Sequence, residues 1–164
     1  MRRNFLKLLS GCCLSGLLNL AYALEAGQMA PDVALGGTTV ASQMADLRGR
    51  YVYVDFWASW CGPCRLSFPW LGKLQASYKS DELTVLAINL DKQRRDADRF
   101  LLQTPAAFAL AYDPSGESAR RFEVKTMPSS YLIGPDGKVL LTHRGFTAED
   151  TAQLESQIER LLRK

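Results

Sequence analysis

The chain is poor in the residues that bind metals or cross-link small secreted folds. Its 164 residues include four cysteines and a single histidine. That cysteine density is far below that of a disulfide-stabilised scaffold, so the cysteines raise a question of chemistry and not of architecture. The sequence also lacks internal repeats and low-complexity stretches, and its 47% hydrophobic and 23% charged residues are ordinary values for a globular protein. The length suits one domain preceded by a short targeting segment.

The first 23 positions contain no acidic residue. Their basic residues are Arg2, Arg3 and Lys7. An apolar stretch with small and polar interruptions follows, and it ends in the small-x-small sequence Ala-Tyr-Ala at residues 21–23. This layout predicts a secretory signal peptide over residues 1–23 that is cleaved after Ala23.

Two details of this segment bear on the route of export. Residues 2–7, Arg-Arg-Asn-Phe-Leu-Lys, resemble the twin-arginine export motif, so we predict that route, with an ordinary Sec signal as the alternative. Residues 9–12, Leu-Ser-Gly-Cys, also match a lipobox, which would acylate Cys12 and anchor the protein to a membrane. The apolar length before Cys12 is short for that reading. The expected location is the periplasm.

The expected mature domain, residues 24–164, has no charge excess. Removal of the signal peptide takes away three of the 20 basic residues and none of the 17 acidic ones. A nucleic-acid partner would need a net basic surface or a basic stripe, so none is expected. The same cleavage removes two of the four cysteines and leaves Cys61 and Cys64 in a C-x-x-C motif.

The hydrophobic pattern of this domain predicts strands that alternate with helices. Residues 33–40 favour an N-terminal β-hairpin that turns at Gly36-Gly37. Residues 51–57, aromatic and β-branched except for Asp55, predict a buried central strand. Further predicted helices cover residues 62–79, 93–103, 117–122 and 147–162, and further predicted strands cover residues 83–90, 108–112, 129–133 and 139–143. The pattern indicates an α/β fold with a mixed sheet flanked by helices.

The C-x-x-C motif has several chemical interpretations. A structural zinc site needs four ligands, and the mature chain adds only His143 to the two cysteines. A structural disulfide across two residues would close a very small loop and constrain the unfolded chain little. The position of the motif between a predicted strand and a predicted helix fits a redox-active dithiol, which needs no metal or other cofactor.

A position at the start of a helix gives the two cysteines different expected roles. Cys61 lies where unpaired N–H groups and the helix dipole favour an anion, so it is the predicted nucleophilic thiolate. Pro63 has the fixed φ that suits a first helical turn, and Gly62 permits the close approach of a substrate chain. Cys64, one turn later, is expected to be more buried and to resolve the mixed disulfide by attacking the Cys61 sulfur.

Residues 54–64, Val-Asp-Phe-Trp-Ala-Ser-Trp-Cys-Gly-Pro-Cys, resemble the active-site segment of thioredoxin. Pro69 falls where thioredoxins carry the proline that kinks the active-site helix, and Met127-Pro128 precedes a strand at the position of the family's cis-proline. The resemblance covers about residues 28–163. It implies a thioredoxin-like fold.

Three features are similar to those of the exported TlpA/ResA-like thiol-disulfide oxidoreductases. They are the export signal, the sequence Leu-Arg-Gly-Arg at residues 47–50, and an inserted helix–strand unit at about residues 92–113. The resemblance implies a monomeric periplasmic enzyme that reduces disulfides in exported proteins. It also implies a membrane thiol-transfer reductase as electron donor, and substrates in cytochrome c or copper-site assembly.

Asp55 stands in a buried-strand pattern, where an unpaired charge costs several kcal/mol. Burial is therefore expected to raise its pKa. The resemblance implies that Asp55 accepts the proton of Cys64; a strand-end carboxylate in contact with solvent is the alternative. Thioredoxins often place a lysine near this aspartate in the next strand, and Ala87 stands at the matching position here.

The resemblance implies substrate-binding roles for residues on either side of the cysteines. Trp60 would shield the site, although simple packing is an equal alternative. Pro128 would adopt the cis form and face Cys61, while Met127 offers backbone groups to a substrate strand. Gly62 and Pro63 would also contact substrate. His143 is given no role.

Other activities remain open on the sequence alone. Gly62-Pro63 matches the reducing thioredoxins, but a disulfide oxidant or isomerase would use the same cysteines. A peroxidase of the peroxiredoxin type would need a threonine three residues before its cysteine, where this chain has Ala58. A non-catalytic copper-delivery protein would need a further ligand, for which His143 and Met127 are the candidates.

Overall fold

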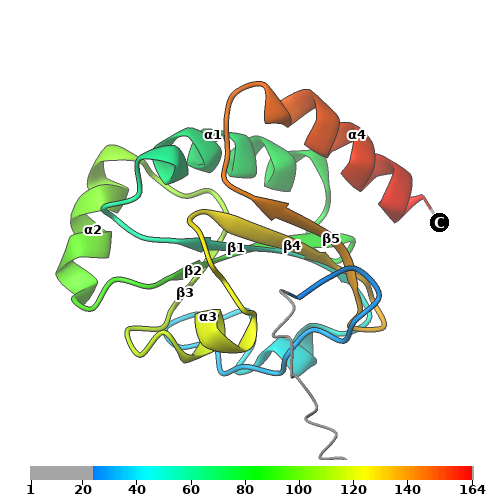
Figure 1. Ribbon diagram of the computed structural model, residues 1–164, viewed down its shortest axis with the longest axis horizontal. Helices are drawn as coiled ribbons and strands as arrows, with labels where there is room; N and C mark the ends of the chain where they lie inside the picture. Colours follow the sequence, from blue (N-terminus) through cyan, green and yellow to red (C-terminus); the bar gives the residue numbers. More distant parts are fainter. Residues whose placement is uncertain (1–23, 164) are drawn as a thin grey trace, which may run out of the picture.

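A five-stranded mixed sheet with helices on both faces forms the core of the computed structural model, which describes residues 24–163 (Figure 1). The strands are β1 Tyr51–Trp57, β2 Leu83–Asn89, β3 Ala109–Tyr112, β4 Ser129–Ile133 and β5 Val139–Arg144. The helices are η1 Met44–Leu47, a 3₁₀ helix, and α1 Gly62–Ser77, α2 Arg94–Gln103, α3 Glu117–Arg121 and α4 Asp150–Leu162. The predicted α/β class is confirmed. The predicted signal peptide over residues 1–23 lies outside the described residues.

The strand order β3-β2-β1-β4-β5 makes β1 the central strand. β1 pairs in parallel with β2, and β2 with β3, through the crossover helices α1 and α2. β1 pairs antiparallel with β4, and β4 with β5. Since every residue of β1 after Tyr51 is buried, its near-continuous apolar run is that of a strand covered on both faces. The inserted helix–strand unit is α2 with β3, and β3 forms one edge of the sheet.

Two hydrophobic clusters lie on opposite faces of the sheet. We call the face covered by α1, α2 and α4 the α1 face, and the opposite one the α3 face. Figure 1 shows α1 and α4 on one side of the sheet and α3 on the other. The cluster on the α1 face joins Trp57 to Phe68 of α1 and Ile158 of α4. The cluster on the α3 face joins Phe56 to Phe122, next to α3, and to the N-terminal segment.

The N-terminal segment pairs with itself, and its turn begins at the two glycines, where Gly37 has a φ of 70°, but the return strand predicted at residues 38–40 is wrong. Ala34 forms an antiparallel bridge with Gln43, so the residues that pair with the first strand of the hairpin come after residues 38–40. Gly36 lies instead against the edge strand β3, where its carbonyl accepts the N–H of Tyr112 at 2.9 Å. A Cβ at Gly36 would lie 2.9 Å from the Tyr112 carbonyl oxygen, so the close approach of two backbones, and not a turn, requires glycine there.

Each of the other predicted elements is present within a few residues of its expected bounds. At the start of α4 the N–H of Thr147 donates to the Asp150 carboxylate, which is half of a capping box. None of the helices within residues 24–163 is long and apolar enough to cross a membrane.

Candidate active site

The C-x-x-C motif lies where β1 gives way to α1. Cys61 is the residue that caps α1, and its Sγ accepts the backbone N–H of Cys64 at 3.2 Å. The two sulfur atoms form a disulfide 2.05 Å long. Cys61 keeps 4% of its surface exposed and Cys64 keeps none, which is the order of burial expected for an attacking and a resolving cysteine.

The loop that leads to Cys61 is held by a carboxylate that sequence reasoning missed. The buried Asp91 accepts the backbone N–H and the hydroxyl of Ser59, both at 2.9 Å. Asn89 donates its amide to the same carboxylate at 2.8 Å. These polar residues lie at or just after the ends of β1 and β2, which are neighbouring parallel strands, so that placement was the signal available in the sequence. The network fixes the turn that presents the cysteines.

Asp55 is buried in the middle of the sheet, with 1% of its surface exposed. Its neighbours in register are Ala87 on β2 and Ser130 on β4, so no lysine stands beside it on either strand. Burial raises the pKa of the Asp55 carboxyl to about 7, as the sequence predicted in direction, and a hydrogen bond from the Ser130 hydroxyl partly opposes this rise.

Ser130, which contacts Asp55, is the second residue that the sequence did not single out. Its hydroxyl donates to Asp55 Oδ1 at 2.7 Å, and only 4% of its surface is exposed. Since Ser130 comes two residues after Pro128, the hydrogen bond joins the aspartate to the strand that follows the cis-proline. A serine pair at the start of a buried strand, directly after Pro128, was the sequence signal for it.

The Asp55 side chain lies among polar atoms that have no partner. Asp55 Oδ2, the Tyr53 hydroxyl and Trp57 Nε1 are buried without a hydrogen bond. The three residues alternate along β1 and therefore point to the same face, the α1 face, whose cluster includes Cys64. Burial and the Asp55 carboxylate raise the pKa of the Tyr53 hydroxyl. This face of β1 therefore carries buried polar groups that an apolar core would not contain.

The Met127–Pro128 peptide bond is cis, as predicted. The loop is fixed from two sides, because Gly145 N–H donates to the Pro128 carbonyl at 2.8 Å and the Ser129 hydroxyl donates to the Thr126 carbonyl at 2.8 Å. Met127 packs against the cluster on the α1 face that also contains both cysteines.

The aromatic and small residues of the motif differ in exposure. Trp60 is 71% exposed, whereas the other two tryptophans are buried in the core. Gly62 and Pro63 are exposed in the first turn of α1. These three residues therefore form an open surface around the nearly buried Cys61. The predicted shielding by Trp60 stays a prediction.

The peroxidase and copper-delivery alternatives depend on Ala58 and His143, whose surroundings are as follows. Ala58, three residues before Cys61, is buried and offers no hydroxyl, and the neighbouring Ser59 hydroxyl is bound to Asp91. His143 Nε2 lies 3.7 Å from the Asp150 carboxylate. Within residues 24–163, no group of three or more His, Cys, Asp or Glu side chains is placed to hold a metal ion.

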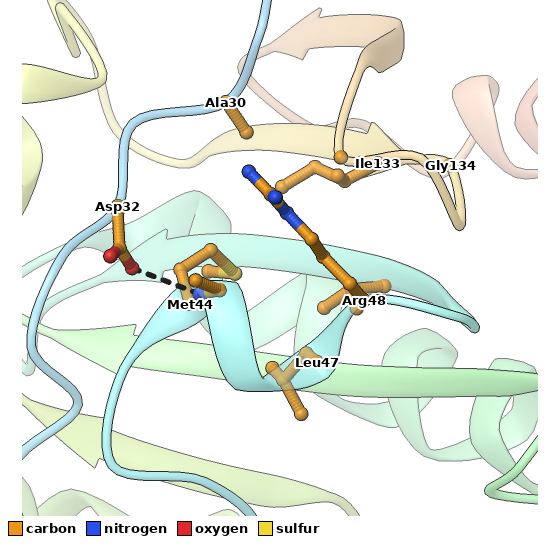
Figure 2. Close-up of a pocket in the computed structure, with 10 residues that line it drawn as sticks. Ala30, Asp32, Met44, Leu47, Arg48, Ile133 and Gly134 are labelled. Carbon is orange, nitrogen blue, oxygen red and sulfur yellow. Dashed lines mark hydrogen bonds between the residues drawn. The ribbon is translucent and has the colours of Figure 1, made fainter.

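The cavity in Figure 2 lies away from the cysteines, between the N-terminal segment and the turn after β4. Its volume is about 20 Å³, room for about one water molecule. Asp32 at its side accepts the N–H of Ala45 at 2.9 Å, and Arg48 extends across it towards Ala30 and Ile133. None of the predicted site residues lines this cavity, so it is separate from the predicted site.

A disulfide-forming C-x-x-C pair at a helix start, a cis-proline before an antiparallel strand, and a buried aspartate in the central strand together define a thioredoxin-like thiol-disulfide oxidoreductase. The chain belongs to the AhpC/TSA family, whose model matches residues 26–142. This chain is therefore a member of that family with thiol-disulfide oxidoreductase function.

Individual relatives agree with this class. The chain is 30% identical to the thiol-disulfide oxidoreductase ResA of Bacillus thuringiensis subsp. konkukian, over 86% of this chain and 79% of the relative. It is 51% identical to a Chlorobium tepidum protein described as the thiol:disulfide interchange protein DsbE, with a TM-score of 0.80 over 85% of this chain and 99% of the other. A Bacteroides thetaiotaomicron structure described as a protein disulfide isomerase is 27% identical, with a TM-score of 0.74 over 87% of this chain and 93% of the other.

Proposed function

We propose that this oxidoreductase is an exported reductase of protein disulfides that acts as a monomer in the periplasm. The observation that carries the proposal is the pair formed by a slightly exposed Cys61 at the helix cap and a fully buried Cys64. In such a pair the Cys61 sulfur can attack a large partner, whereas the buried Cys64 sulfur can react only with Cys61. The cycle uses the two sulfur atoms alone and needs no cofactor.

The first step is attack by the reduced Cys61. The N–H groups and dipole at the start of α1 favour its thiolate form. The thiolate forms a bond with one sulfur of the substrate disulfide, and the second substrate sulfur leaves as a thiolate. During this mixed-disulfide stage, Trp60, Gly62 and Pro63 contact the substrate, and the backbone at Met127 and Pro128 pairs with its extended chain.

The second step is resolution by Cys64. Asp55, which accepts a proton near neutral pH because of its raised pKa, takes the proton of Cys64. The Cys64 thiolate then attacks Cys61 Sγ, which forms the intramolecular disulfide, breaks the bond from Cys61 to the substrate and releases that remaining substrate sulfur as a thiolate. Two electrons pass to the substrate and the enzyme dithiol becomes a disulfide. A membrane thiol-transfer reductase would restore the dithiol by the same exchange in reverse.

The direction of electron flow is supported by Gly62-Pro63, which lacks the histidine that strong oxidants often carry between the cysteines. The test compares, in one redox buffer, the rate of insulin-disulfide reduction with the rate of oxidation of a reduced peptide dithiol. Reduction is expected to be the faster. If peptide oxidation is the faster, the protein is an oxidant and the reductase proposal fails.

The roles of the two cysteines predict different outcomes for their serine variants. Cys61→Ser should abolish insulin reduction, whereas Cys64→Ser should accumulate mixed disulfides with periplasmic proteins. Trapping these partners would show whether they serve cytochrome c or copper-site assembly. Ser77→Ala, at the far end of α1, is the matched control and should keep full activity. Copper content measured on the same sample tests the rival delivery function: stoichiometric copper with no insulin reduction would favour it.

Export rests on the sequence of residues 1–23. Replacing Arg2 and Arg3 together by lysine should leave the precursor in the cytoplasm if the twin-arginine route is used. Normal export of this variant would favour the Sec route. The mature N-terminus should be Leu24, and a lipid-modified Cys12 would show that the protein is a membrane-anchored lipoprotein instead.

A further inference from the structure

A surface cleft of about 170 Å³ opens beside the active-site motif, between the start of α1 and α2. It is lined by Ser59, Arg65, Asp96, Arg99, Phe100 and Gln103. Ser59 comes two residues before Cys61, and Arg65 comes four residues after it. The cleft, which we call the Arg65 cleft, therefore borders the segment that carries Cys61, on the side of α2.

The Arg65 guanidinium is held in place without being neutralised. Its central carbon lies 4.6 Å from the centre of the Phe100 ring, and it donates a hydrogen bond to Gln103 Oε1 at 3.3 Å. None of the ion pairs formed among residues 24–163 includes Arg65. A guanidinium has five N–H donors, so most of them remain available to a planar, two-oxygen acceptor such as a carboxylate.

The charges around the cleft favour an anion. Arg99 lies 3.5 Å from Asp96, and both side chains are exposed, so this pair is weakly coupled. Two guanidinium groups and one carboxylate leave the lining with a net charge of +1. The first turn of α1 carries no acid, and a cation so close to a helix N-terminus is opposed by the dipole. Local rules of this kind are most often broken at functional sites.

We infer that the Arg65 cleft binds an acidic side chain of the substrate polypeptide, and so selects disulfides that have Asp or Glu nearby. The inference rests on the proposed function, because it names the substrate class of the same site. Four residues of helix span about 6 Å, which is about two residues of an extended chain. The acidic residue should therefore stand about two positions from the cysteine that Cys61 attacks.

The test uses two synthetic peptides that differ in one residue, Glu or Gln, two positions from a cysteine carried as a 2-pyridyl disulfide. Release of thiopyridone reports a single turnover of the pre-reduced enzyme with each peptide in excess, and KM and kcat here denote the half-saturating peptide concentration and the limiting rate of that turnover. The unaltered enzyme should show a KM about 5- to 20-fold lower for the Glu peptide, with a similar kcat, because a charge-assisted hydrogen bond of this strength binds substrate before the chemical step. Added salt should shrink the difference.

Variants separate the cleft from the cysteines. Arg65→Ala should make the two KM values equal, and Arg65→Lys should keep part of the preference, because lysine retains the charge and loses the planar geometry. Lys73→Ala, an exposed cation on the same helix away from the cleft, should keep the full preference. Each variant is compared as the ratio of its two KM values, which cancels any effect on the Cys61 thiol.

Equal KM values for the unaltered enzyme, or an unchanged preference in Arg65→Ala, would overturn the inference and leave the proposed reductase intact. If neither peptide reacts, and insulin is not reduced either, the proposed function fails and the inference fails with it.

Discussion

The two faces of β1 are built from alternate residues of one strand, and they differ in kind. On the α3 face lie Val52, Val54 and Phe56, which carry only hydrocarbon. On the α1 face lie Tyr53, Asp55 and Trp57, and each of them has a buried polar atom without a hydrogen-bond partner. The same strand thus has one face that packs as an ordinary core and one that does not.

The difference is best explained by the cysteines on the α1 face. A buried polar group that lacks a partner lowers the stability of a fold by about 1–3 kcal/mol. Three such groups on one face are not expected in a sheet with a purely structural role. Cys64 shares this face, and in the proposed function its proton acceptor, Asp55, must be buried with it. On that proposal, the α3 face supplies stability and the α1 face gives up some of it for redox chemistry.

The largest effect on stability is expected from the α3 face. Phe56 packs against the rings of Phe122 and Tyr131 at centroid distances of 5.2 and 6.0 Å. Phe56→Ala should lower the free energy of unfolding by about 3–5 kcal/mol, because it leaves a cavity among these rings. Denaturant melts of the oxidised protein measure this change, with Phe56→Leu as the milder control.

The activity of Phe56→Ala tests whether the α3 face contributes to catalysis. Insulin reduction per folded molecule of Phe56→Ala should stay close to that of the parent, because Phe56 points away from the cysteines. A large fall in the activity per folded molecule would contradict the proposed division between the two faces.

The next largest effect is expected at Asp55, in the opposite direction. In the folded protein Asp55 stays protonated up to about pH 7, whereas its ordinary pKa is 3.8. The folded state therefore binds one more proton between these values, and its stability falls as pH rises through them. Asp55→Asn escapes this loss, so it should be similar to the parent near pH 4 and more stable by up to about 4 kcal/mol at pH 8.

The same substitution should slow catalysis. Without a proton acceptor for Cys64, resolution of the mixed disulfide should fall by about 100-fold, the usual contribution of general acid–base catalysis. The measurements are denaturant melts at the two pH values and insulin-reduction kinetics. A variant that is less stable at pH 8 and equally fast would show that Asp55 is a structural residue.

The smallest effect is expected from Ser130, whose hydroxyl stabilises the ionised form of Asp55. Ser130→Ala should raise the pKa of Asp55 by up to about one unit, since a hydrogen bond of this kind contributes about 1 kcal/mol. The pH at which resolution of the mixed disulfide is half-maximal should rise accordingly. Ser130→Thr keeps a hydroxyl, so its pH profile should match that of the parent. Ser129→Ala removes a neighbouring hydroxyl that bonds only to the Thr126 backbone, so its profile should not move.

Sequence patterns predicted the parts of the molecule that local physics determines. The strand at residues 51–57 and the helix after Cys61 follow from a continuous apolar run and from a helix-compatible first turn. The raised pKa of Asp55 followed from a charge placed in that run. These inferences need only neighbouring residues, and the structure confirms them.

The missed features depend on which strands become neighbours. Ser130 meets Asp55 only because β4 pairs with β1, and Asp91 reaches Ser59 only because β1 and β2 end side by side. Gly36 was taken for a turn residue, but it is required by an edge strand more than 70 positions away. Sequence periodicity gives the face of a strand and not the identity of its partner.

The central claim is that the Asp55 carboxyl, on the α1 face of β1, gains and loses a proton near neutral pH and accepts the proton of Cys64. The most direct test is an NMR titration of the Asp55 side-chain carboxyl carbon in the oxidised and reduced protein. The account predicts a midpoint of about 7 in the oxidised form and a higher one in the reduced form, where the Cys61 thiolate adds its repulsion. A midpoint close to the ordinary value of 3.8 in both forms would contradict it.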